Sequence, residues 1–558
     1  MGIGPTLVKR KLITQEQLDS ALAARKNPAD RIEKILVDMG FVTERAVLEV
    51  IGEQLHIPVL DLNESIIDKA LLKTIPSKIV HRYHLVPIDK VNGTIRVATS
   101  NAFDLYAFDE LRMITGSRIE PVLAPSTDIS RVIKQFFGVA GHTLEELIGD
   151  DQVEIVSDID ETDADAIEAA QEATVVKLVN EILVEAIRDR ASDVHIEPYE
   201  HSLKIRYRID GVLHTTNVPP EVRRFQNAIV SRIKILSNLN IAERRLPQDG
   251  GFKIKTGNRD IDLRVSIIPA MFGEAVVMRI LDKATVLLSL QDLGMIDQVY
   301  VDFHRIIRQP HGIVLVTGPT GSGKTTTLYA ALNSIKSEDT KILTVEDPVE
   351  YYLDGIQQIG VQRKIGLTFA HGLRAFLRHD PDVILVGEIR DLETAEVAVN
   401  ASLTGHLVFS TLHTNDAPTA NTRLLDMGVE PFLVSSSIEG VLAQRLVRKV
   451  CKSCGQEYQP EPGSVPADLL LEPGQTLRRG AGCRECRHTG YKGRMGIFEL
   501  LVMNDEVRNL IVSRGTATDI RNLAREKYDM KMLREDGWNK VRSGLTTVDE
   551  VVRVSKAG

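Results

Sequence analysis

Short apolar runs alternate with helical patterns between residues 296 and 450. The runs predict four strands, at 313–317, 341–346, 383–387 and 407–411. Strands that are separated by helices favour a mainly parallel sheet with helices on both faces. Because ligands of such sheets bind at the carboxyl ends of the strands, we expect the chemistry of this domain at that edge.

Residues 174 to about 290 show a different pattern. A stretch with helical spacing, from Thr174 to Ile187, comes first, and segments in which apolar and polar residues alternate follow it. Alternation then predicts strands at 203–211, 251–256, 260–268 and 275–281. The pattern is typical of a compact α+β domain, which here precedes the α/β domain in the chain.

A weak internal repeat marks residues 1–138. Leu7-Val8, Leu12-Ile13-Thr14 and Leu18 recur as Leu36-Val37, Phe41-Val42-Thr43 and Val47, at an offset of 29 residues. Each copy predicts a short helix pair, with Thr14 or Thr43 as the N-cap of its second helix. Gly40 suits the turn of the second copy, and Lys11 holds that place in the first.

Alternating segments at 59–62, 84–88 and 94–99 add a small α/β unit to this repeat. Short apolar repeats usually form packing faces, so we interpret residues 1–138 as a docking domain that binds another protein. Residues 139–173 differ, because they contain no Lys or Arg while acidic residues accumulate. This composition predicts a flexible, self-repelling linker, and an acidic segment that binds a partner is the alternative.

Composition limits the classes of protein that fit. The chain has 558 residues, 43% hydrophobic and 26% charged, which is typical of a soluble globular protein with three or four domains. A net charge of −9 disfavours a protein that grips nucleic acid. The sequence shows neither an apolar run long enough to span a bilayer nor a signal-peptide pattern. We therefore expect a cytoplasmic protein that meets a membrane only through partners or an amphipathic surface.

The first strand of the α/β domain runs into a glycine-rich loop. Residues Gly318-Pro319-Thr320-Gly321-Ser322-Gly323-Lys324-Thr325 fit the pattern G-x-x-x-x-G-K-[ST], and Thr326 continues into the predicted helix. The glycines let successive backbone N–H groups turn toward phosphate oxygens, and the helix start adds positive potential. Lys324 is expected to reach the β- and γ-phosphates of ATP, and the Thr325 hydroxyl to ligate Mg²⁺. An accidental glycine-rich turn is the alternative.

Acidic and imidazole groups follow the next three strands. The second strand ends in Glu346-Asp347, the third in Gly387-Glu388, and the fourth leads to His413. Glu388 is our candidate for orienting or deprotonating the attacking water. Glu346 and Asp347 would assist through the water shell of the metal. His413 would sense the γ-phosphate, and a structural histidine at a strand end is the alternative.

Four arginines are candidates for stabilising the transition state. Arg374 and Arg378 are spaced for one face of a helix that we predict at 369–379, and Arg264 and Arg279 lie on predicted strands of the α+β domain. An arginine that reaches across a domain or subunit boundary can gate hydrolysis. Each of the four alone is more often part of a surface ion pair.

Four cysteines form two close pairs, Cys451/Cys454 and Cys483/Cys486. In a cytosolic chain, CxxC pairs with this separation are typical of a closed tetrahedral Zn²⁺ site. Closed zinc sites are structural, so we expect no catalytic role. Disulfides or four unlinked thiols are the alternatives. Residues 496–558, which follow, are interpreted as helical.

These segments resemble the secretion-superfamily ATPases. Gly318–Thr325, Thr344–Glu350, Arg374–Asp382, Val386–Asp391 and Thr404–His413 look like the Walker A motif, Asp box, arginine-bearing segment, Walker B motif and His box of that family. Residues 191–198 and 245–250 resemble the family as well. Within it, 426–432 and 441–448 look most like the type II secretion ATPase, and the type IV pilus assembly ATPase is the runner-up.

The resemblance implies a RecA-like P-loop domain at 291–450. It follows an α+β domain at 174–290, the linker at 139–173 and the docking domain at 1–138, and a zinc module at 451–495 and a helical region at 496–558 come after it. The resemblance also implies a homohexameric ATPase at an inner-membrane platform that drives pseudopilus assembly and protein secretion. It further implies that Arg264, Arg279, Arg374 and Arg378 are nucleotide contacts.

The N-terminal repeat is similar to a version of this domain that binds a cyclic dinucleotide, although Lys11 and Glu33 replace expected glycines. Two further classes of protein compete with an ATPase. One is a scaffold that senses nucleotide without hydrolysing it, and the other is a nucleic-acid translocase, which the acidic balance disfavours.

Overall fold

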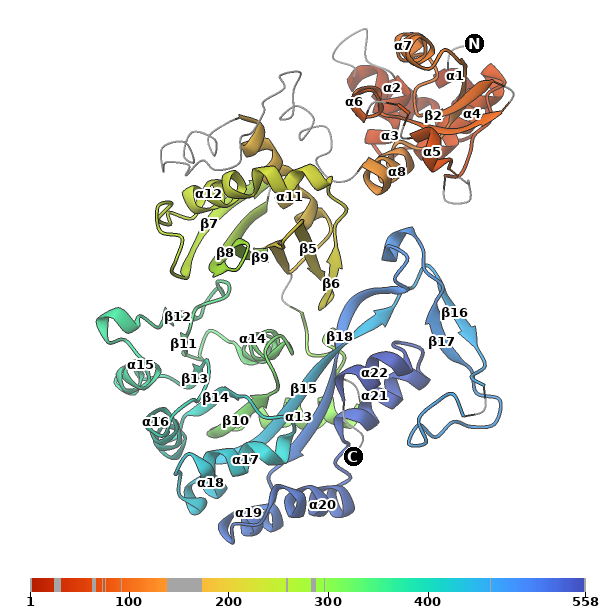
Figure 1. Ribbon diagram of the computed structural model, residues 1–558. Helices are drawn as coiled ribbons and strands as arrows, with labels where there is room; N and C mark the ends of the chain where they lie inside the picture. The colour runs from red at the N-terminus through yellow and green to blue at the C-terminus, as the bar shows by residue number, and fades with distance from the viewer. Residues whose placement is uncertain are drawn as a thin grey trace. The chain divides into compact units, whose positions relative to one another are not determined.

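The structure is a computed structural model, and it divides the chain into two compact units, Met1–Ile280 and Leu281–Gly558, each described here by itself (Figure 1). It describes residues 3–24, 32–62, 67–72, 74–75, 77–91, 93–137, 173–256, 259–282, 288–295, 297–461 and 463–555. Among the helices of these residues, none combines the length and the apolar character that crossing a bilayer requires. Most of the predicted acidic linker, residues 139–172, lies outside the described residues.

Two helix pairs open the first unit. The first consists of α1 (Ile3–Lys9) and α2 (Gln15–Ala24), and the second of α3 (Ile32–Asp38) and α4 (Glu44–Leu55). Corresponding helices start 29 residues apart, so the predicted repeat is confirmed. Their apolar faces pack into one small core around Leu7, Leu36 and Ile51.

The predicted caps and turns of the repeat are present. The backbone N–H groups of Gln17 and Ala46 donate to the hydroxyls of Thr14 and Thr43, which start the second helix of each pair. The turn between the helices needs a left-handed residue in both copies. Gly40 has a φ of 73° and Lys11 a φ of 60°, so Lys11 adopts this backbone conformation without being glycine.

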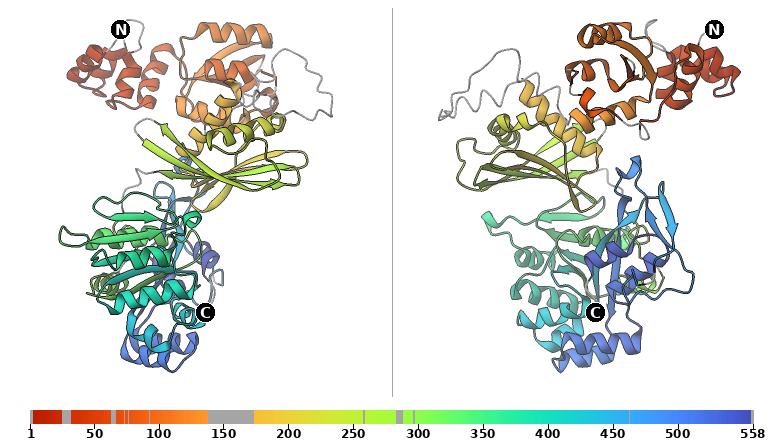
Figure 2. Two further views of the ribbon diagram at one scale, coloured as in Figure 1. Left: turned by 90° about the vertical axis from the view of Figure 1, so that its left-hand side faces the viewer. Right: turned by 45° about the vertical axis from the view of Figure 1, so that its right-hand side comes forward.

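A small α/β unit completes the N-terminal region. Strand β1 (Leu85–Val91) pairs antiparallel with β2 (Thr94–Thr99), which pairs parallel with β3 (Arg118–Leu123). The helices around it are α5 (Lys69–Leu72), α6 (Ser77–Tyr83), α7 (Leu105–Thr115) and α8 (Ser126–Phe137). Residues 59–62, which we expected to form a strand, contribute only an isolated bridge from Val59 to Leu123. Figure 2 shows α1–α4 in red and this sheet in orange.

The remainder of the first unit is a six-stranded antiparallel sheet with helices on one face. The strand order is β6-β5-β4-β9-β8-β7. The elements are α11 (Ala173–Arg188), β4 (Asp193–Pro198), β5 (Leu203–Ile209), β6 (Val212–Thr215), η1 (Pro220–Phe225), α12 (Gln226–Leu236), β7 (Gln248–Thr256), β8 (Arg259–Ala270) and β9 (Gly273–Asp282). The apolar side chains of the sheet pack against α11 and α12, and the charged ones lie on the opposite face.

A seven-stranded sheet organises the second unit. Its strands, in spatial order, are β12 (Gln357–Gly360), β11 (Ile342–Glu346), β13 (Val383–Val386), β14 (Leu407–Leu412), β10 (Gly312–Thr317), β15 (Ile438–Val450) and β18 (Tyr491–Val502). All neighbours are parallel except β15 and β18. All four predicted strands are present, and the predicted α/β fold with a mainly parallel sheet is confirmed.

Helices cover both faces of this sheet, as predicted. One face carries α13 (Asp297–Ile306) and α14 (Lys324–Ile335). The other carries α15 (Phe369–Phe376), α16 (Leu392–Leu403), α17 (Ala417–Asp426) and α18 (Pro431–Ser437). The two apolar cores on either side of the sheet fix the strand ends, and hence the loops that follow them.

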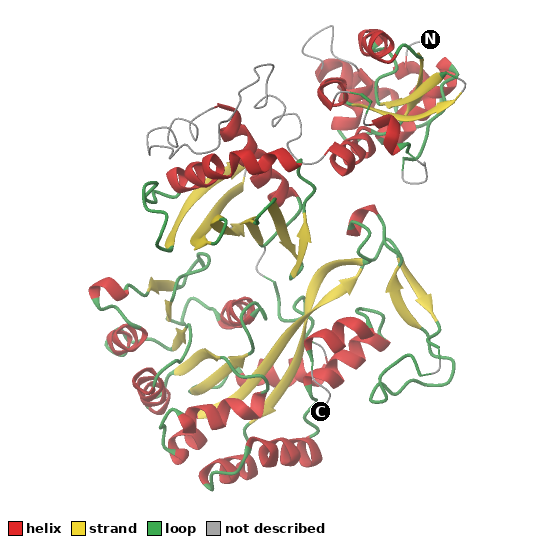
Figure 3. Ribbon diagram, in the orientation of Figure 1, coloured by secondary structure: helices red, strands yellow, loops and turns green. Residues whose placement is uncertain are grey.

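The C-terminal region is a long strand pair with helices packed on it. In Figure 3, β15 and β18 run as long yellow strands toward the small hairpin β16 (Gly455–Tyr458) and β17 (Leu477–Gly480). The helical elements are η3 (Arg484–Cys486), α19 (Asp505–Val512), α20 (Ala517–Tyr528), α21 (Leu533–Arg542) and α22 (Val548–Val554).

Our helical interpretation of residues 496–558 is wrong for 496–502, which belong to β18. These residues pair with β15 at the edge of the sheet and are buried there, so tertiary packing decides their conformation. The domain boundaries given above remain predictions.

Candidate functional site

The glycine-rich loop connects β10 to α14. Its glycines have positive φ angles of 150° (Gly318), 79° (Gly321) and 88° (Gly323), as the predicted loop requires. A Cβ atom on Gly318 would lie 2.6 Å from the carbonyl oxygen of Gln444, and one on Gly323 would lie 2.9 Å from Nε2 of the same residue. The loop therefore lies directly against β15, and close packing as well as backbone conformation requires these two glycines.

Lys324 starts α14 and is half-buried. Its Nζ donates to the carbonyl oxygens of Gly318 (2.8 Å) and Pro319 (3.2 Å), so the ammonium group lies within the loop. Burial lowers the pKa of Lys324, and the carboxylate of Glu388 opposes this change. Lys324 starts α14 at the same edge of the sheet at which Glu388 follows β13.

Glu388 follows β13 and is held on both carboxylate oxygens. Arg390 forms an ion pair with Oε1 at 2.5 Å, and Nε2 of His413 lies 3.1 Å from Oε2. Burial alone would raise the pKa of Glu388, but these two partners outweigh burial and hold the pKa below its usual value. The geometry thus joins the predicted Glu388 and His413 and keeps an ionised carboxylate at the strand ends.

Glu346 and Asp347 diverge at the end of β11. Glu346 is buried and accepts hydrogen bonds from Tyr329 (2.5 Å), Thr344 (2.6 Å) and Gln358 (3.2 Å). Burial and the Glu346 carboxylate raise the pKa of Tyr329. Asp347 is partly exposed and pairs with Arg363 at 2.8 Å. Of the two carboxylates, Asp347 is the more accessible one.

Two of the four predicted arginines, Arg374 and Arg378, lie on and just after α15. Arg374 pairs with Glu393 at 2.7 Å and is exposed, and Arg378 donates to the carbonyl oxygen of Arg374. Arg378 lies beyond the C-terminal end of α15, because that helix ends at Phe376 instead of continuing to 379.

Arg264 and Arg279 belong to the other unit, on β8 and β9. Both lie on the charged face of the six-stranded sheet, where Arg279 donates to Asp193 at 3.0 Å. Their role at the nucleotide remains a prediction.

Sequence reasoning missed two residues that shape this site. Arg390 appeared in the sequence analysis only within the segment Val386–Asp391. Its position two residues after Glu388 could have predicted that the two side chains form an ion pair. Gln444 was visible only within one of the segments that resemble the family, and the pairing of β10 with β15 is what places it under the loop. There its Oε1 accepts a hydrogen bond from Thr327 at 2.6 Å.

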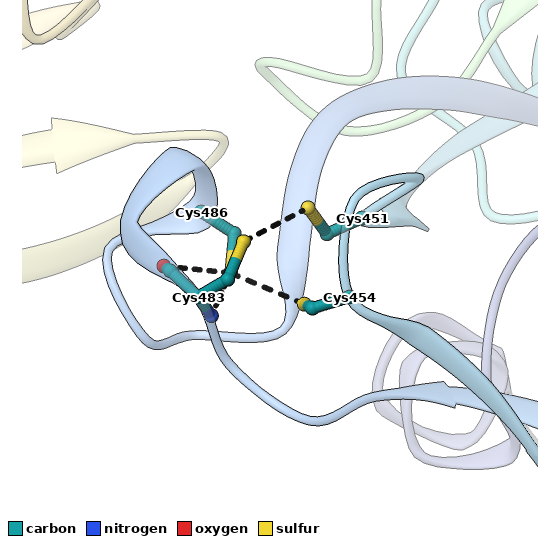
Figure 4. Close-up of side chains that lie close together, drawn as sticks. All are labelled: Cys451, Cys454, Cys483 and Cys486. Atoms are coloured by element: carbon teal, nitrogen blue, oxygen red, sulfur yellow. Dashed lines mark hydrogen bonds between the residues drawn. The ribbon is translucent and has the colours of Figure 1, made fainter. Parts of the chain in front are cut away.

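The four cysteines come together between the far ends of β15 and β18. Figure 4 shows the pairs Cys451/Cys454 and Cys483/Cys486 facing each other from two loops. The sulfur atoms lie within 4.8 Å of one another, and the distances Cys451–Cys483, Cys454–Cys486 and Cys483–Cys486 are each 3.7 Å. A tetrahedral zinc–thiolate site with bonds of ~2.3 Å has edges of ~3.8 Å. The cluster fits Zn²⁺ and contains no disulfide.

Comparison with known proteins identifies the family of this chain. The family described as "Type II/IV secretion system protein" matches residues 168–553, and the "MshEN domain" family matches residues 55–143. The chain is 42% identical to the type IV pilus assembly ATPase PilB of Myxococcus xanthus, over 99% of this chain and 98% of that protein. It is 41% identical to the type II secretion system protein E of Xanthomonas campestris, over 99% and 97% of the two chains.

Other relatives match about three quarters of the chain at higher identity. The type II secretion system protein E of Pseudomonas aeruginosa is 50% identical over 73% of this chain and 80% of its own. Among solved structures, the pilus retraction motor PilT with bound ADP covers 68% of this chain and 96% of its own, at 27% identity and a TM-score of 0.46. The P-loop, the parallel sheet and the match to residues 168–553 together show that the chain belongs to the type II/IV secretion system protein family, a family of ATPases with a RecA-like fold.

Proposed function

We propose that this protein is an Mg²⁺-dependent ATPase that drives a type II secretion system. The observation that carries the proposal is the placement of Glu388, which is ionised and held by Arg390 and His413 at the strand ends. A carboxylate in this position can orient or deprotonate the water that attacks the γ-phosphate. A protein that only senses nucleotide does not require such a group.

The P-loop residues would bind the phosphate chain. Backbone N–H groups of Gly318–Thr326 would surround it, and Lys324 would leave its loop carbonyls to contact the β- and γ-phosphates. When bound, Mg²⁺ neutralises phosphate charge. The Thr325 hydroxyl and the carboxylate of Asp347 are oxygen donors of the kind that Mg²⁺ prefers, so the residues present fit this ion.

Three further groups have supporting roles in this proposal. Glu346 would act on the metal's water shell through Oε2, which accepts one hydrogen bond, from Tyr329, whereas Oε1 accepts two. His413 would respond to the γ-phosphate through its contact with Glu388. Arg264, Arg279, Arg374 and Arg378 would contact the nucleotide across domain or subunit boundaries.

We assign the motor to protein secretion on the basis of its relatives. Identities of 50% to type II secretion E proteins, over 73% and 70% of this chain, support pseudopilus assembly and secretion. Assembly of type IV pili is the second candidate, because a pilus assembly ATPase matches almost the whole chain at 42% identity. In either machine we propose a cytoplasmic homohexamer, peripheral to the inner membrane, with a structural Zn²⁺ at the four cysteines.

The N-terminal region would dock on the inner-membrane platform of the machine. Its match to the MshEN domain family supports a binding role for this region. A cyclic dinucleotide is the second ligand that we propose for it. Titration of the full-length protein with a cyclic dinucleotide tests this ligand, and absence of saturable binding would refute it.

Steady-state phosphate release from the purified full-length protein tests the enzyme assignment. We expect magnesium-dependent hydrolysis that Lys324→Ala and Glu388→Gln each reduce by at least about a hundredfold. Glu388→Gln should retain ATP binding, because this residue acts on water and not on the phosphate chain. Wild-type rates in both variants would refute hydrolysis at this site.

Two further results would favour the competing classes of protein. Saturable ATP binding without phosphate release in the wild-type protein would favour the nucleotide-sensing scaffold. Turnover that depends on added DNA or RNA would favour a nucleic-acid translocase. Rescue of secretion or of pilus assembly in a deletion strain distinguishes the two machines.

A further inference from the structure

A second cation lies beside the P-loop, on β15. This strand runs parallel to β10 with Ala443 beside Thr317, so Gln444 and Arg445 lie alongside the start of the loop. A Cβ atom on Gly318 would be 3.1 Å from Nη1 of Arg445. The guanidinium group therefore lies in direct contact with the loop that receives phosphate.

Only neutral groups hold this guanidinium in place. Nη1 donates to the carbonyl oxygen of Gln444 at 2.9 Å. Nη2 donates to the carbonyl oxygen and to Oδ1 of Asn415, at 2.9 and 3.2 Å. Within the described part of the chain, Arg445 forms no ion pair, whereas Arg448 on the same strand pairs with Glu550 at 2.7 Å. Arg445 is thus a half-buried charge without a counter-ion.

Two partly buried cations, Lys324 and Arg445, lie at this loop. Burial lowers the pKa of Arg445, although Glu499 and Asp416 oppose this change at longer range. Burial also lowers the pKa of Lys324, which the Glu388 carboxylate opposes and the Arg445 guanidinium reinforces. Two partly desolvated cations beside one loop repel each other and are costly without a partner. An anion that contacts both would remove this cost.

We infer that Arg445 is a direct ligand of the phosphate chain of the bound nucleotide, in addition to the P-loop, and this inference rests on the proposed ATPase function. Its planar group presents a fork of donors that matches phosphate oxygens. Nη1 exchanges the Gln444 carbonyl for a phosphate oxygen, while Nη2 keeps its contact with Asn415. The ligand is a nucleoside di- or triphosphate. ADP is included because it shares with ATP the α- and β-phosphates, which the P-loop surrounds.

Calorimetric titration of the full-length protein with ADP and with ATP tests this inference. Arg445→Gln should weaken both affinities about tenfold or more, since a charge-assisted hydrogen bond is lost. Arg445→Lys retains the charge but lacks the fork, and should weaken both at least about threefold. Arg448→Gln is the matched control on the same strand and should leave both affinities unchanged. In steady-state hydrolysis, the Arg445 variants should raise KM more than they lower kcat.

Wild-type affinity of Arg445→Gln for ADP, or a fall in kcat with unchanged KM, would overturn the inference and would leave the ATPase proposal intact. Thermal unfolding without nucleotide checks that each variant is folded. If Arg445→Gln does not fold, Arg445→Lys provides the test. Wild-type ADP affinity in that variant would show that the guanidinium fork does not contact phosphate. Tight ADP binding without hydrolysis in the wild-type protein would refute the proposed function alone.

Discussion

The imidazole Nε2 of His413 lies 3.1 Å from Oε2 of Glu388, across the ends of the neighbouring strands β14 and β13. Arg390 holds the other carboxylate oxygen of Glu388. The carboxylate is therefore held on both of its oxygens by side chains that follow these two strands. This arrangement makes the ionisation of Glu388 measurable through the rate of hydrolysis.

The first prediction concerns the pH dependence of hydrolysis. Arg390 and His413 hold the pKa of Glu388 below its usual value, so a rate that requires the carboxylate is lost only when the pH falls below about 4.5. Arg390→Gln removes an opposing charge and leaves burial to raise this pKa. We therefore expect the acid limb of kcat/KM to move to higher pH. Initial rates of the wild type and the variant between about pH 3.5 and 8 measure this change.

A matched control for Arg390 lies on α13. Arg305 is exposed and pairs with Asp302 at 3.1 Å, away from the strand ends. Arg305→Gln should leave the acid limb unchanged. An acid limb that does not move in Arg390→Gln would show that Glu388 is not the group that titrates.

The second prediction separates packing from backbone conformation in the P-loop. In Gly318→Ala the new Cβ would meet the Gln444 carbonyl and the Ser322 hydroxyl, both at 2.6 Å, so the loop must shift. A Cβ on Gly321 meets nothing within 4 Å, and Gly321→Ala costs only the left-handed conformation, about 1 kcal/mol. We expect Gly318→Ala to weaken ADP binding at least about tenfold.

Calorimetric titration with ADP, together with thermal unfolding, compares these two variants. Gly321→Ala should weaken ADP binding less than Gly318→Ala does. Equal loss of affinity in the two variants would mean that contact with β15 is not what requires Gly318.

These residues also show where sequence reasoning succeeds. The four strands and the glycine loop could be predicted because their signals are local, namely short apolar runs and fixed glycine spacing. The helix repeat was visible for the same reason. The repeat placed Lys11 at the turn position that Gly40 occupies in the second copy. Its left-handed conformation could be expected from that position but not from its residue type.

What escaped the sequence depends on contacts between distant segments. Nothing in the sequence indicated that the packing of α14 places Tyr329 against Glu346. Glu499 lies in the segment that we interpreted as helical. The structure buries it on β18, where it accepts hydrogen bonds from the N–H groups of Ala417 and Leu533 at the starts of α17 and α21. Buried carboxylates such as Glu346 and Glu499 cannot be identified from the sequence, because their hydrogen-bond partners come from distant strands and helices.

The third prediction concerns the cysteine cluster. We expect about one Zn²⁺ per chain, since four thiolates complete one tetrahedral site. Cys483→Ser should lose the ion, because three ligands bind it less tightly. The N–H of Cys451 donates to the Gly490 carbonyl at 2.9 Å, so the cluster joins the far ends of β15 and β18. Loss of zinc should therefore increase amide exchange in residues 451–492.

Metal analysis and hydrogen exchange by mass spectrometry measure these two effects. Exchange in β10 and α14 is the internal control and should not change, because neither element contributes a ligand. A protein that is folded and free of zinc, with protection of 451–492 equal to that of the wild type, would contradict a structural zinc site.

The fourth prediction concerns acid stability. Glu550 on α22 is 1% exposed and accepts hydrogen bonds from the N–H and guanidinium of Arg448 and from Arg553. Burial would raise its pKa, but these donors hold it at about 2. Because the folded carboxyl has the lower pKa, its stabilisation is complete above pH ~4.5, is lost as the pH falls toward 2, and amounts to about 3 kcal/mol.

Thermal unfolding between pH 3 and 7 tests this assignment. Glu550→Gln should lower the melting temperature at pH 7, and the difference from the wild type should shrink as the pH falls from 5 to 3. Glu506 on α19 forms an exposed pair with Lys527, so Glu506→Gln should have little effect at any pH. A difference between Glu550→Gln and the wild type that stays constant with pH would mean that the ionised carboxylate does not join α22 to β15. The loss would then be one of packing, because only the charge titrates in this range.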